Sequence, residues 1–375
     1  MPDMGTRFHR LARESTDFAH WKLPVAALLA VCFFFAASMV LVLGALVVVA
    51  LGGETGAIED FIDATARFDL LDPGIFVFAM LSIIVMVPSV WAGTAIVWHR
   101  HARFLLSVEG RLRWGWMARC FLLAGLVLGI AIGGAVALAA SSGTASFEFT
   151  DRSVLMIVLV VLLVPLQSAA EEYAFRGFGL QLIGSWVKSP ILPLAVTTLV
   201  FAAGHIYEFW GLVDVAVFGL AAGWLTIRTG GLEAAIAIHV VNNVLLFVLG
   251  AVGLVDPTGE EGDLGPVDVL PTVIAMAAMV ALVEWQSRRV GLVTRRPPQA
   301  PRPTPPRAPT GGPPFPGPPM GGPPPGWVPP PGWVPPPARP IVPVPGQAPD
   351  YPGQLTPGWP VPPRRGARTP EVRPW

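Results

Sequence analysis

Residues 153–176 read SVLMIVLVVLLVPLQSAAEEYAFR. Residues 153–170 contain no charged side chain, and their number is close to the roughly 20 apolar residues with which a helix crosses a bilayer. Glu171, Glu172 and Arg176 follow at once. A charged group at bilayer depth costs at least roughly 2.5 kcal/mol on insertion scales, so such groups are usually functional. This stretch therefore predicts a membrane helix that ends in a polar site.

The composition of the whole chain also indicates a membrane protein. Its 375 residues are 53% hydrophobic and 13% charged, and the mean hydropathy is +0.59. These values are too apolar for a water-soluble protein. Lys and Arg number 25, as do Asp and Glu, so no net positive charge favours nucleic acid as a partner. With only Cys32 and Cys120, a disulfide framework and a four-thiolate zinc site are excluded.

Eight apolar stretches predict the fold class: all-α, a polytopic membrane bundle of about eight transmembrane helices. They are residues 23–53, 73–98, 120–147, 153–170, 189–204, 209–227, 234–255 and 266–283. The first stretch is too long for a cleavable signal peptide and is expected to remain as an anchor. The predicted organisation is an N-terminal segment at 1–22, three accessory helices in 23–152, a functional core at 153–255, a last helix in 256–290 and a tail at 291–375.

The charges between the spans predict the orientation. The loop at 54–69 is acidic, and the loop at 100–119 is basic. Because basic loops stay in the cytoplasm, eight crossings place both termini there. The lipid bilayer is thus a partner of the protein. The high content of Ala, Gly, Pro and Arg is typical of a GC-rich bacterial genome, so we expect a bacterial plasma membrane.

The tail at 291–375 contains most of the 42 prolines and a tandem repeat of the sequence GWVPPP at 326–337. Such a composition cannot form a packed core, and it predicts a disordered, polyproline-like segment. A protein that recognises proline-rich sequences is one possible partner, with Trp327 and Trp333 as anchors. The other interpretation is a low-complexity spacer without a binding role.

The polar residues of the core fall on three apolar spans. Glu172 and Arg176 share a helix face and are predicted to pair. Glu171 points about 100° away from Glu172 on an α-helix, so it is predicted to be the carboxylate that transfers protons. His205 ends the fifth span, in the sequence FAAGH. A second histidine, His239, has Asn243 one turn further along the same face of the seventh span.

The spacing of these residues from the turns predicts whether they can meet. Glu171 and His205 lie at similar numbers of residues from the turn near residues 187–188, so they are level, roughly 25 Å from it. For His239 to reach the same depth, the hairpin that carries this turn must project about 10 Å into the cytoplasm. Arg176, Gln181 and Lys188 make the hairpin unsuited to lipid. We therefore predict that it projects.

At these residues the chain resembles the CAAX-protease and bacteriocin-processing family (CPBP, also called Abi) of intramembrane proteases. The three matching motifs are Glu-Glu-x-x-x-Arg at 171–176, Phe-x-x-x-His at 201–205 and His-x-x-x-Asn at 239–243. Any one of them is common, but all three occur in order within apolar spans. The resemblance covers residues 153–255. It implies an endopeptidase whose peptide or protein substrate enters from the membrane or the cytoplasm, and the substrate is not identified by these residues.

The resemblance also implies roles for the individual residues. Glu171 and His205 would activate the attacking water, and His239 with Asn243 would stabilise the oxyanion. Glu172 and Arg176 would form a structural or substrate-orienting pair. This division agrees with the chemistry of carboxylate, imidazole and amide groups. No cofactor is required in this interpretation.

Three alternatives remain open. In the first, His205, His239 and Glu171 bind zinc, as the name metalloprotease given to members of the family suggests. Against zinc, the chain has no His-Glu-x-x-His helix. In the second, the chain is a proton-coupled transporter, although it shows no internal repeat. In the third, it is a non-catalytic membrane scaffold.

Overall fold

The computed structural model describes residues 5–15, 17–52, 57–67, 70–99, 101–143, 147–255 and 265–297, and residues 328, 331 and 332. Almost all regular structure in these ranges is helical, and their only β pairing consists of two isolated bridges. The all-α prediction is therefore confirmed. The proline-rich segment after residue 297, with Trp327 and Trp333, falls outside the described residues except at those three positions.

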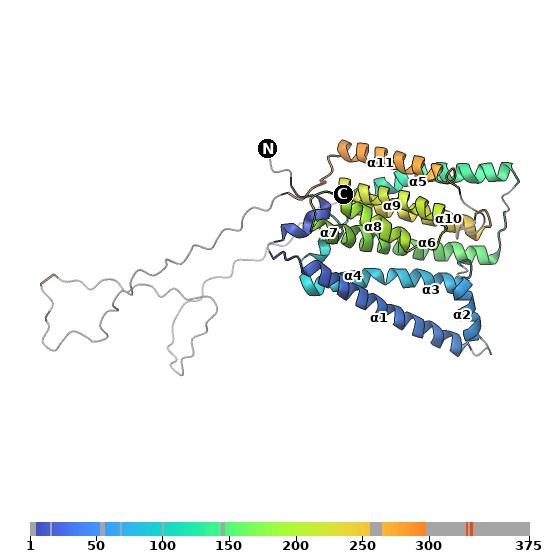
Figure 1. Ribbon diagram of the computed structural model, residues 1–375, viewed down its shortest axis with the longest axis horizontal. Coiled ribbons are helices and arrows are strands. Elements are labelled where there is room, and N and C mark those ends of the chain that lie inside the picture. The colour runs from blue at the N-terminus through green and yellow to red at the C-terminus, as the bar shows by residue number, and fades with distance from the viewer. Residues whose placement is uncertain are drawn as a thin grey trace, which may run out of the picture. The chain divides into compact units, whose positions relative to one another are not determined.

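The described residues form fourteen helical elements. In order they are η1 (Phe8–Glu14), α1 (Lys22–Leu51), α2 (Ala57–Arg67), α3 (Pro73–Ile84), α4 (Met86–Trp98), η2 (Ala102–Leu105), α5 (Trp114–Ser141), α6 (Asp151–Glu171), η3 (Glu172–Gly179), α7 (Leu180–Gly184), α8 (Ile191–Ala203), α9 (Phe209–Thr229), α10 (Glu233–Ala251) and α11 (Leu270–Arg289). The elements η1 and η2 are 3-10 helices, and η3 is a π-helix. Figure 1 shows the long helices running side by side.

Seven helical runs in the described residues are long and apolar enough to cross a membrane, so the chain is an integral membrane protein. Seven of the eight predicted spans fall on them, with α3 and α4 forming one run. The fifth predicted span is instead α8, a helix of 13 residues. At 1.5 Å per residue it is about 20 Å long, shorter than the roughly 30 Å of a hydrocarbon core. The predicted stretch of 16 residues was itself short, and α8 begins after Pro190 and ends at Ala203 within it.

Helix α9 ends in a turn that only glycine fits. Gly230 has a φ of 75°, and an added Cβ atom would lie 2.6 Å from the carbonyl oxygen of Thr294. Its N–H donates to Thr226 O, which satisfies one of the last carbonyls of the helix. The chain therefore reverses within three residues and starts α10 directly alongside α9.

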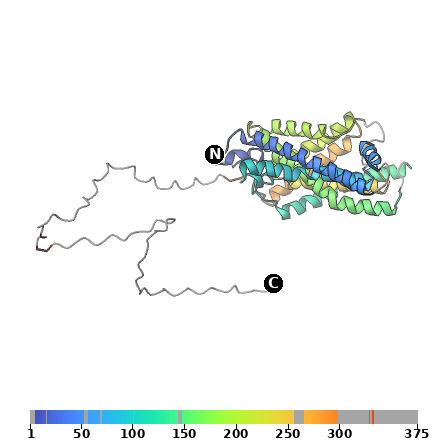
Figure 2. The same cartoon turned by 90° about the horizontal axis from the view of Figure 1, so that it is seen from below.

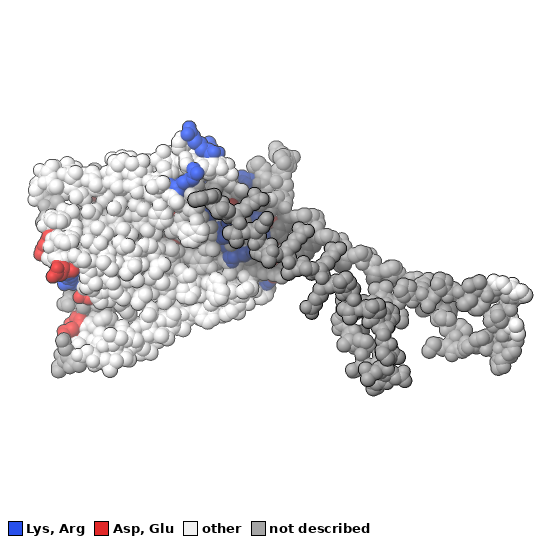
Figure 3. All heavy atoms as spheres, turned by 180° about the vertical axis from the view of Figure 1, so that it is seen from behind, with Lys and Arg blue, Asp and Glu red and all other residues white. Residues whose placement is uncertain are grey.

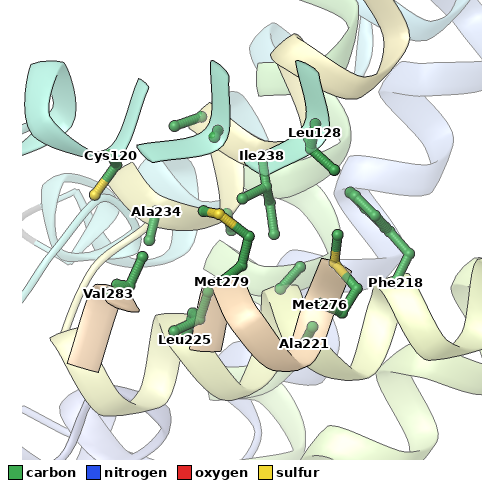
Figure 4. Packing of buried hydrophobic residues seen from close by; sticks show 14 of the residues in the cluster. Cys120, Leu128, Phe218, Ala221, Leu225, Ala234, Ile238, Met276, Met279 and Val283 are labelled. Carbon is green, nitrogen blue, oxygen red and sulfur yellow. The ribbon is translucent and has the colours of Figure 1, made fainter. Parts of the chain in front are cut away.

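The core of the bundle lies where α5, α9, α10 and α11 meet. Figure 4 shows this packing, with Leu128, Phe218, Ile238 and Met279 interdigitated and fully or nearly fully buried. A second cluster joins α1 and α4 to η1 and η3, and a third joins α3 to α6. Figure 2 shows the same bundle seen from below. Small residues permit close contact: an added Cβ atom on Gly93 would lie 2.6 Å from Ala26 O.

The N-terminal helix η1 docks on the end of α7. The side chains of Arg10 and Arg13 donate to the carbonyl oxygens of Val187 and Ser185, at 2.7 and 2.8 Å. Cationic side chains near a helix C-terminus stabilise its unpaired carbonyls. A further pairing joins Thr6 to Arg296, so residues 291–297, which the sequence assigns to the tail, contact the helical body.

The charged residues gather at the two ends of the bundle. Figure 3 shows Lys and Arg toward one end, Asp and Glu mainly at the other, and an almost uncharged side between them. The uncharged side is what lipid requires. The orientation of the two ends stays a prediction: by the positive-inside rule, the end with η1 and the start of α10 is cytoplasmic.

Candidate functional site

The predicted site lies where α6 passes into the π-helix η3. Pro165 stands inside α6 and lacks an N–H to donate, and the helix then widens at Glu172. The wider π turn brings neighbouring side chains closer in direction than an α turn does, and π segments often occur at functional sites. Glu171 and Glu172, predicted to point about 100° apart, both reach His239 on α10 in the structure.

Glu172 is the fully buried centre of an ion-pair network. Its Oε1 atom accepts from Arg176 Nη1 at 3.1 Å and lies 2.7 Å from His239 Nδ1. Arg176 is 1% exposed, donates from Nη2 to Gly219 O at 3.3 Å and lies over the Phe201 ring at 4.0 Å. The predicted pairing of Glu172 with Arg176 is therefore present. Breaking a buried pair typically costs about 3–5 kcal/mol, because the remaining charge is left uncompensated.

His239 lies between two carboxylates. Because a carboxylate oxygen only accepts hydrogen bonds when ionised, His239 Nδ1 carries a proton and donates it to Glu172. His239 Nε2 faces Glu171 Oε2 at 3.4 Å, and this oxygen is buried without a hydrogen-bond partner. The imidazole of His239 therefore contacts one carboxylate with each of its ring nitrogens.

Asn243 is hydrogen-bonded to a residue of α6 and not to His239. Its Nδ2 atom donates to Gln167 Oε1 at 3.4 Å, and its Oδ1 atom accepts from Asn242. Gln167 is buried and also accepts from Ser168 at 3.2 Å. Gln167 lies four residues before Glu171 on the same helix face. His239 and Asn243 were predicted only to share a helix face; in the structure His239 contacts Glu171 and Glu172, and Asn243 contacts Gln167.

His205 stands at the end of α8 and is partly exposed. Its Nδ1 atom donates to the carbonyl of Phe201 at 2.9 Å, which leaves Nε2 as the acceptor in the neutral ring. The imidazoles of His205 and His239 both pack edge-on against Phe201, at ring-centre distances of 4.8 and 6.0 Å. None of the contacts of the described residues joins His205 directly to Glu171.

The contact between His239 and Glu171 shows that these two residues lie at the same depth along the bundle. The helical run Asp151–Gly184 contains 34 residues and is therefore about 50 Å long, well beyond the roughly 30 Å of a hydrocarbon core. Its end packs against η1, next to the basic loop. The length of this run lets Glu171 lie level with His239, which is only six residues into α10.

The described residues contain no group of three His, Cys, Asp or Glu side chains arranged to hold a metal ion. One of the two carboxylates, Glu172, already has its Oε1 atom bound to His239 and Arg176. A third ligand, as zinc needs, would have to come from a rearrangement of His205.

Sequence reasoning missed three residues of the site. Gln167 contacts Asn243, Gly219 accepts from Arg176, and Phe218 packs edge-on against His239 at 5.1 Å. Gln167 could have been found from its position one turn before Glu171 in an apolar span. The roles of Gly219 and Phe218 depend on how α9 packs, and no pattern along α9 indicates them.

The fold and this cluster define a polytopic helical membrane protein with a buried Glu–His–Arg site. Residues 150–245, which include all the predicted site residues, match the family model described as type II CAAX prenyl endopeptidase Rce1-like. The resemblance to the CPBP family is thereby confirmed for this part of the chain.

One curated relative is the uncharacterized protein YyaK of Bacillus subtilis (strain 168). It is 26% identical over 168 residues, which make up 43% of this chain and 56% of that protein. The chain thus spans little more than half the length of this relative. No solved structure matches the chain.

Proposed function

We propose that the chain is an intramembrane endopeptidase of the CPBP type, which hydrolyses a peptide bond at the cluster around Glu171. The contact of His239 with both Glu171 and Glu172 carries this proposal. Peptide hydrolysis needs groups that accept, hold and return one proton next to the reacting carbonyl. The match of residues 150–245 to an endopeptidase family favours hydrolysis over transport or a scaffold.

In this proposal Glu171 is the general base. Unlike Glu172, which is bound by Arg176 and His239, Glu171 contacts His239 Nε2 at 3.4 Å without a hydrogen bond, so its carboxylate can take a proton from a water molecule as that water attacks the carbonyl carbon. His205 directs the same water, because its Nδ1–H is held by Phe201 O and its Nε2 accepts. The proton held by Glu171 then passes to the leaving amine.

His239 and Asn243 stabilise the oxyanion that forms on the carbonyl oxygen. His239 is fixed by its bond to Glu172, so a protonated Nε2 would be held in place before the reaction begins. Asn243 keeps one amide hydrogen for this task while the other bonds to Gln167. One donor of this kind typically lowers the barrier by about 2.7–4 kcal/mol.

We propose that the reaction needs no metal. Two observations support this: the described donors do not form a three-ligand group, and Glu172 is engaged by Arg176 and His239. The alternative is a zinc-dependent form of the same protease. In it, His205 and His239 would move to ligate zinc together with Glu171.

A peptide-release assay on the purified full-length protein in lipid nanodiscs tests the proposal. The two probes are internally quenched peptides: one ends in a farnesylated Cys-a-a-X sequence, chosen because the matching family is described as a prenyl endopeptidase, and one is unmodified. We expect cleavage of at least one probe by the wild type. Glu171→Gln should reduce kcat by about 10²–10⁴-fold.

The same assay with a chelator separates the two mechanisms. Unchanged cleavage after prolonged treatment with 1,10-phenanthroline supports the metal-free form, and loss of cleavage that added zinc restores supports the zinc form. Full activity of Glu171→Gln would contradict both. Arg152→Gln, at an exposed arginine remote from the site, is the control and should cleave like the wild type.

A further inference from the structure

A long groove lies between α9 and α11, on the side of α9 that faces away from the site. Its volume is about 980 Å³. The apolar floor is made by Leu220, Ala221, Met276, Ala277, Val280 and Ala281. Three of these residues are alanines, whose short side chains leave room along the groove. The groove runs along α11 from Val273 to Arg289, about 24 Å at 1.5 Å per residue.

One end of this groove is polar and carries an excess of positive charge. Glu284 accepts from Trp224 Nε1 at 2.9 Å and from Arg228 Nε at 3.0 Å, and Arg288 contacts its other oxygen at 3.3 Å. Arg289 lies over the Trp285 ring at 4.1 Å. Two arginines, Arg228 and Arg288, therefore contact a single carboxylate at the groove's end, and Arg289 adds a third positive charge there.

We propose that this groove binds one anionic phospholipid, with an acyl chain along the alanine-lined floor and the phosphate at Arg288 and Arg289. A lipid matches both halves of the groove, because it joins a long apolar chain to a negative group. Arginine binds phosphate oxygens through paired N–H donors. Tryptophans such as Trp224 and Trp285 are enriched at the level of the headgroups.

The charge and the chemistry of the floor argue against other occupants. An extended peptide would leave its backbone polar groups without partners along a floor of Ala, Leu, Val and Met side chains. A second copy of the chain would bring its own arginines to the same end, where like charges repel. A neutral lipid fits the floor but does not compensate the positive charge.

The proposed lipid site does not depend on the proposed protease activity, although the two share α9. Phe218 and Gly219 face His239 and Arg176, whereas Val217, Leu220 and Ala221 line the groove. A lipid in the groove would thus pack against the back of the helix that contacts the site. Loading the groove is expected to raise the thermal unfolding midpoint, because a ligand that binds only the folded state stabilises it.

Native mass spectrometry of the full-length protein, exchanged from detergent containing equal amounts of phosphatidylglycerol and phosphatidylcholine, tests the inference. We expect one phosphatidylglycerol to be retained about tenfold or more over phosphatidylcholine. The double variant Arg288→Gln/Arg289→Gln should lose that preference, since each arginine near the surface contributes about fivefold. Ala277→Phe, which fills the floor, should lower retention of both lipids.

Matched controls distinguish a specific lipid-binding site in the groove from general attraction of the protein to lipid. Arg103→Gln/Arg111→Gln removes two exposed arginines outside the groove, and Ala137→Phe adds the same bulk to the exposed side of α5. Both should retain phosphatidylglycerol like the wild type, and so should Glu171→Gln, whose site is on the other side of α9. Equal retention of the two lipids by the wild type would overturn the proposal. Loss of preference in the arginine control, or a dimer that Ala277→Phe dissociates, would do so as well.

Discussion

The Nδ1 atom of His239 lies 2.7 Å from Oε1 of Glu172, inside a buried network that also contains Arg176. This bond assigns the two nitrogens of His239 different tasks: Nδ1 anchors the ring, and Nε2 is presented to Glu171. In the proposed mechanism Glu172 is a positioning residue that acts through His239, because its Oε1 atom also binds Arg176, while the neighbouring Glu171, which contacts His239 at 3.4 Å, is the base. Two adjacent carboxylates of the same type thus have different surroundings.

The buried pair of Glu172 and Arg176 predicts a large effect on stability. Glu172→Gln should lower the free energy of unfolding by about 3–5 kcal/mol, because the buried charge of Arg176 loses its partner. Thermal unfolding in detergent measures this change. Arg152→Gln, which removes an exposed ion pair, should cost about 1 kcal/mol or less. Equal melting temperatures of the two variants would refute the prediction.

The hydrogen bond of His205 allows its structural and catalytic contributions to be separated. In His205→Asn, the side-chain amide can still donate to Phe201 O, but it lacks an equivalent of the Nε2 acceptor. We expect the melting temperature to stay near that of the wild type and kcat for peptide release to fall by about 10²-fold or more. If His205→Asn retained activity, the acceptor role of Nε2 would be wrong.

Gln167 is predicted to position Asn243. Gln167→Met keeps a similar volume but removes the acceptor for Asn243 Nδ2 and Ser168. A hydrogen bond of this kind contributes about 0.5–1.5 kcal/mol, so kcat should fall roughly two- to tenfold with little change in KM. Gln167→Glu keeps an acceptor and should restore part of the loss. A change confined to KM would indicate a role in substrate binding instead.

The buried His101 predicts a pH dependence of stability. Burial lowers its pKa to about 4, and the charge of Arg296 acts in the same direction. Since the unfolded chain binds a proton at this residue near pH 6.5 and the folded chain does not, stability should fall as the pH drops from 6.5 toward 4. The slope from one such group is at most about 1.4 kcal/mol per pH unit.

Thermal unfolding of His101→Phe as a function of pH checks this prediction. Phenylalanine keeps the stacking on Trp98, which His101 makes at 4.5 Å, but it cannot bind a proton. The slope should become smaller without vanishing, because burial also lowers the pKa of His9. His20→Phe, at an exposed histidine, is the control and should keep the full slope. An unchanged slope in His101→Phe would show that other groups cause it.

Much of the fold can be read along the chain. Seven of the eight apolar stretches identified in the sequence form long apolar helices in the structure. They could be predicted because the length and the hydropathy of a span are properties of consecutive residues. Sequence reasoning fails at α8, where 16 residues without a charge form a helix of 13. It also misses η1, whose docking depends on the carbonyls of residues 185–188 at the distant end of α7.

For the site, the sequence by itself determined the candidate residues and one contact, the pairing of Glu172 with Arg176, since both are one turn apart on the same helix. Only the tertiary structure decided that His239 bridges the two glutamates and that Gln167 holds Asn243. Those contacts join side chains about 70 residues apart, and they depend on the π-helix at Glu172 and on how α10 packs against α6. Periodicity along one helix specifies which face a residue lies on, but the partner opposite that face is set by packing between helices.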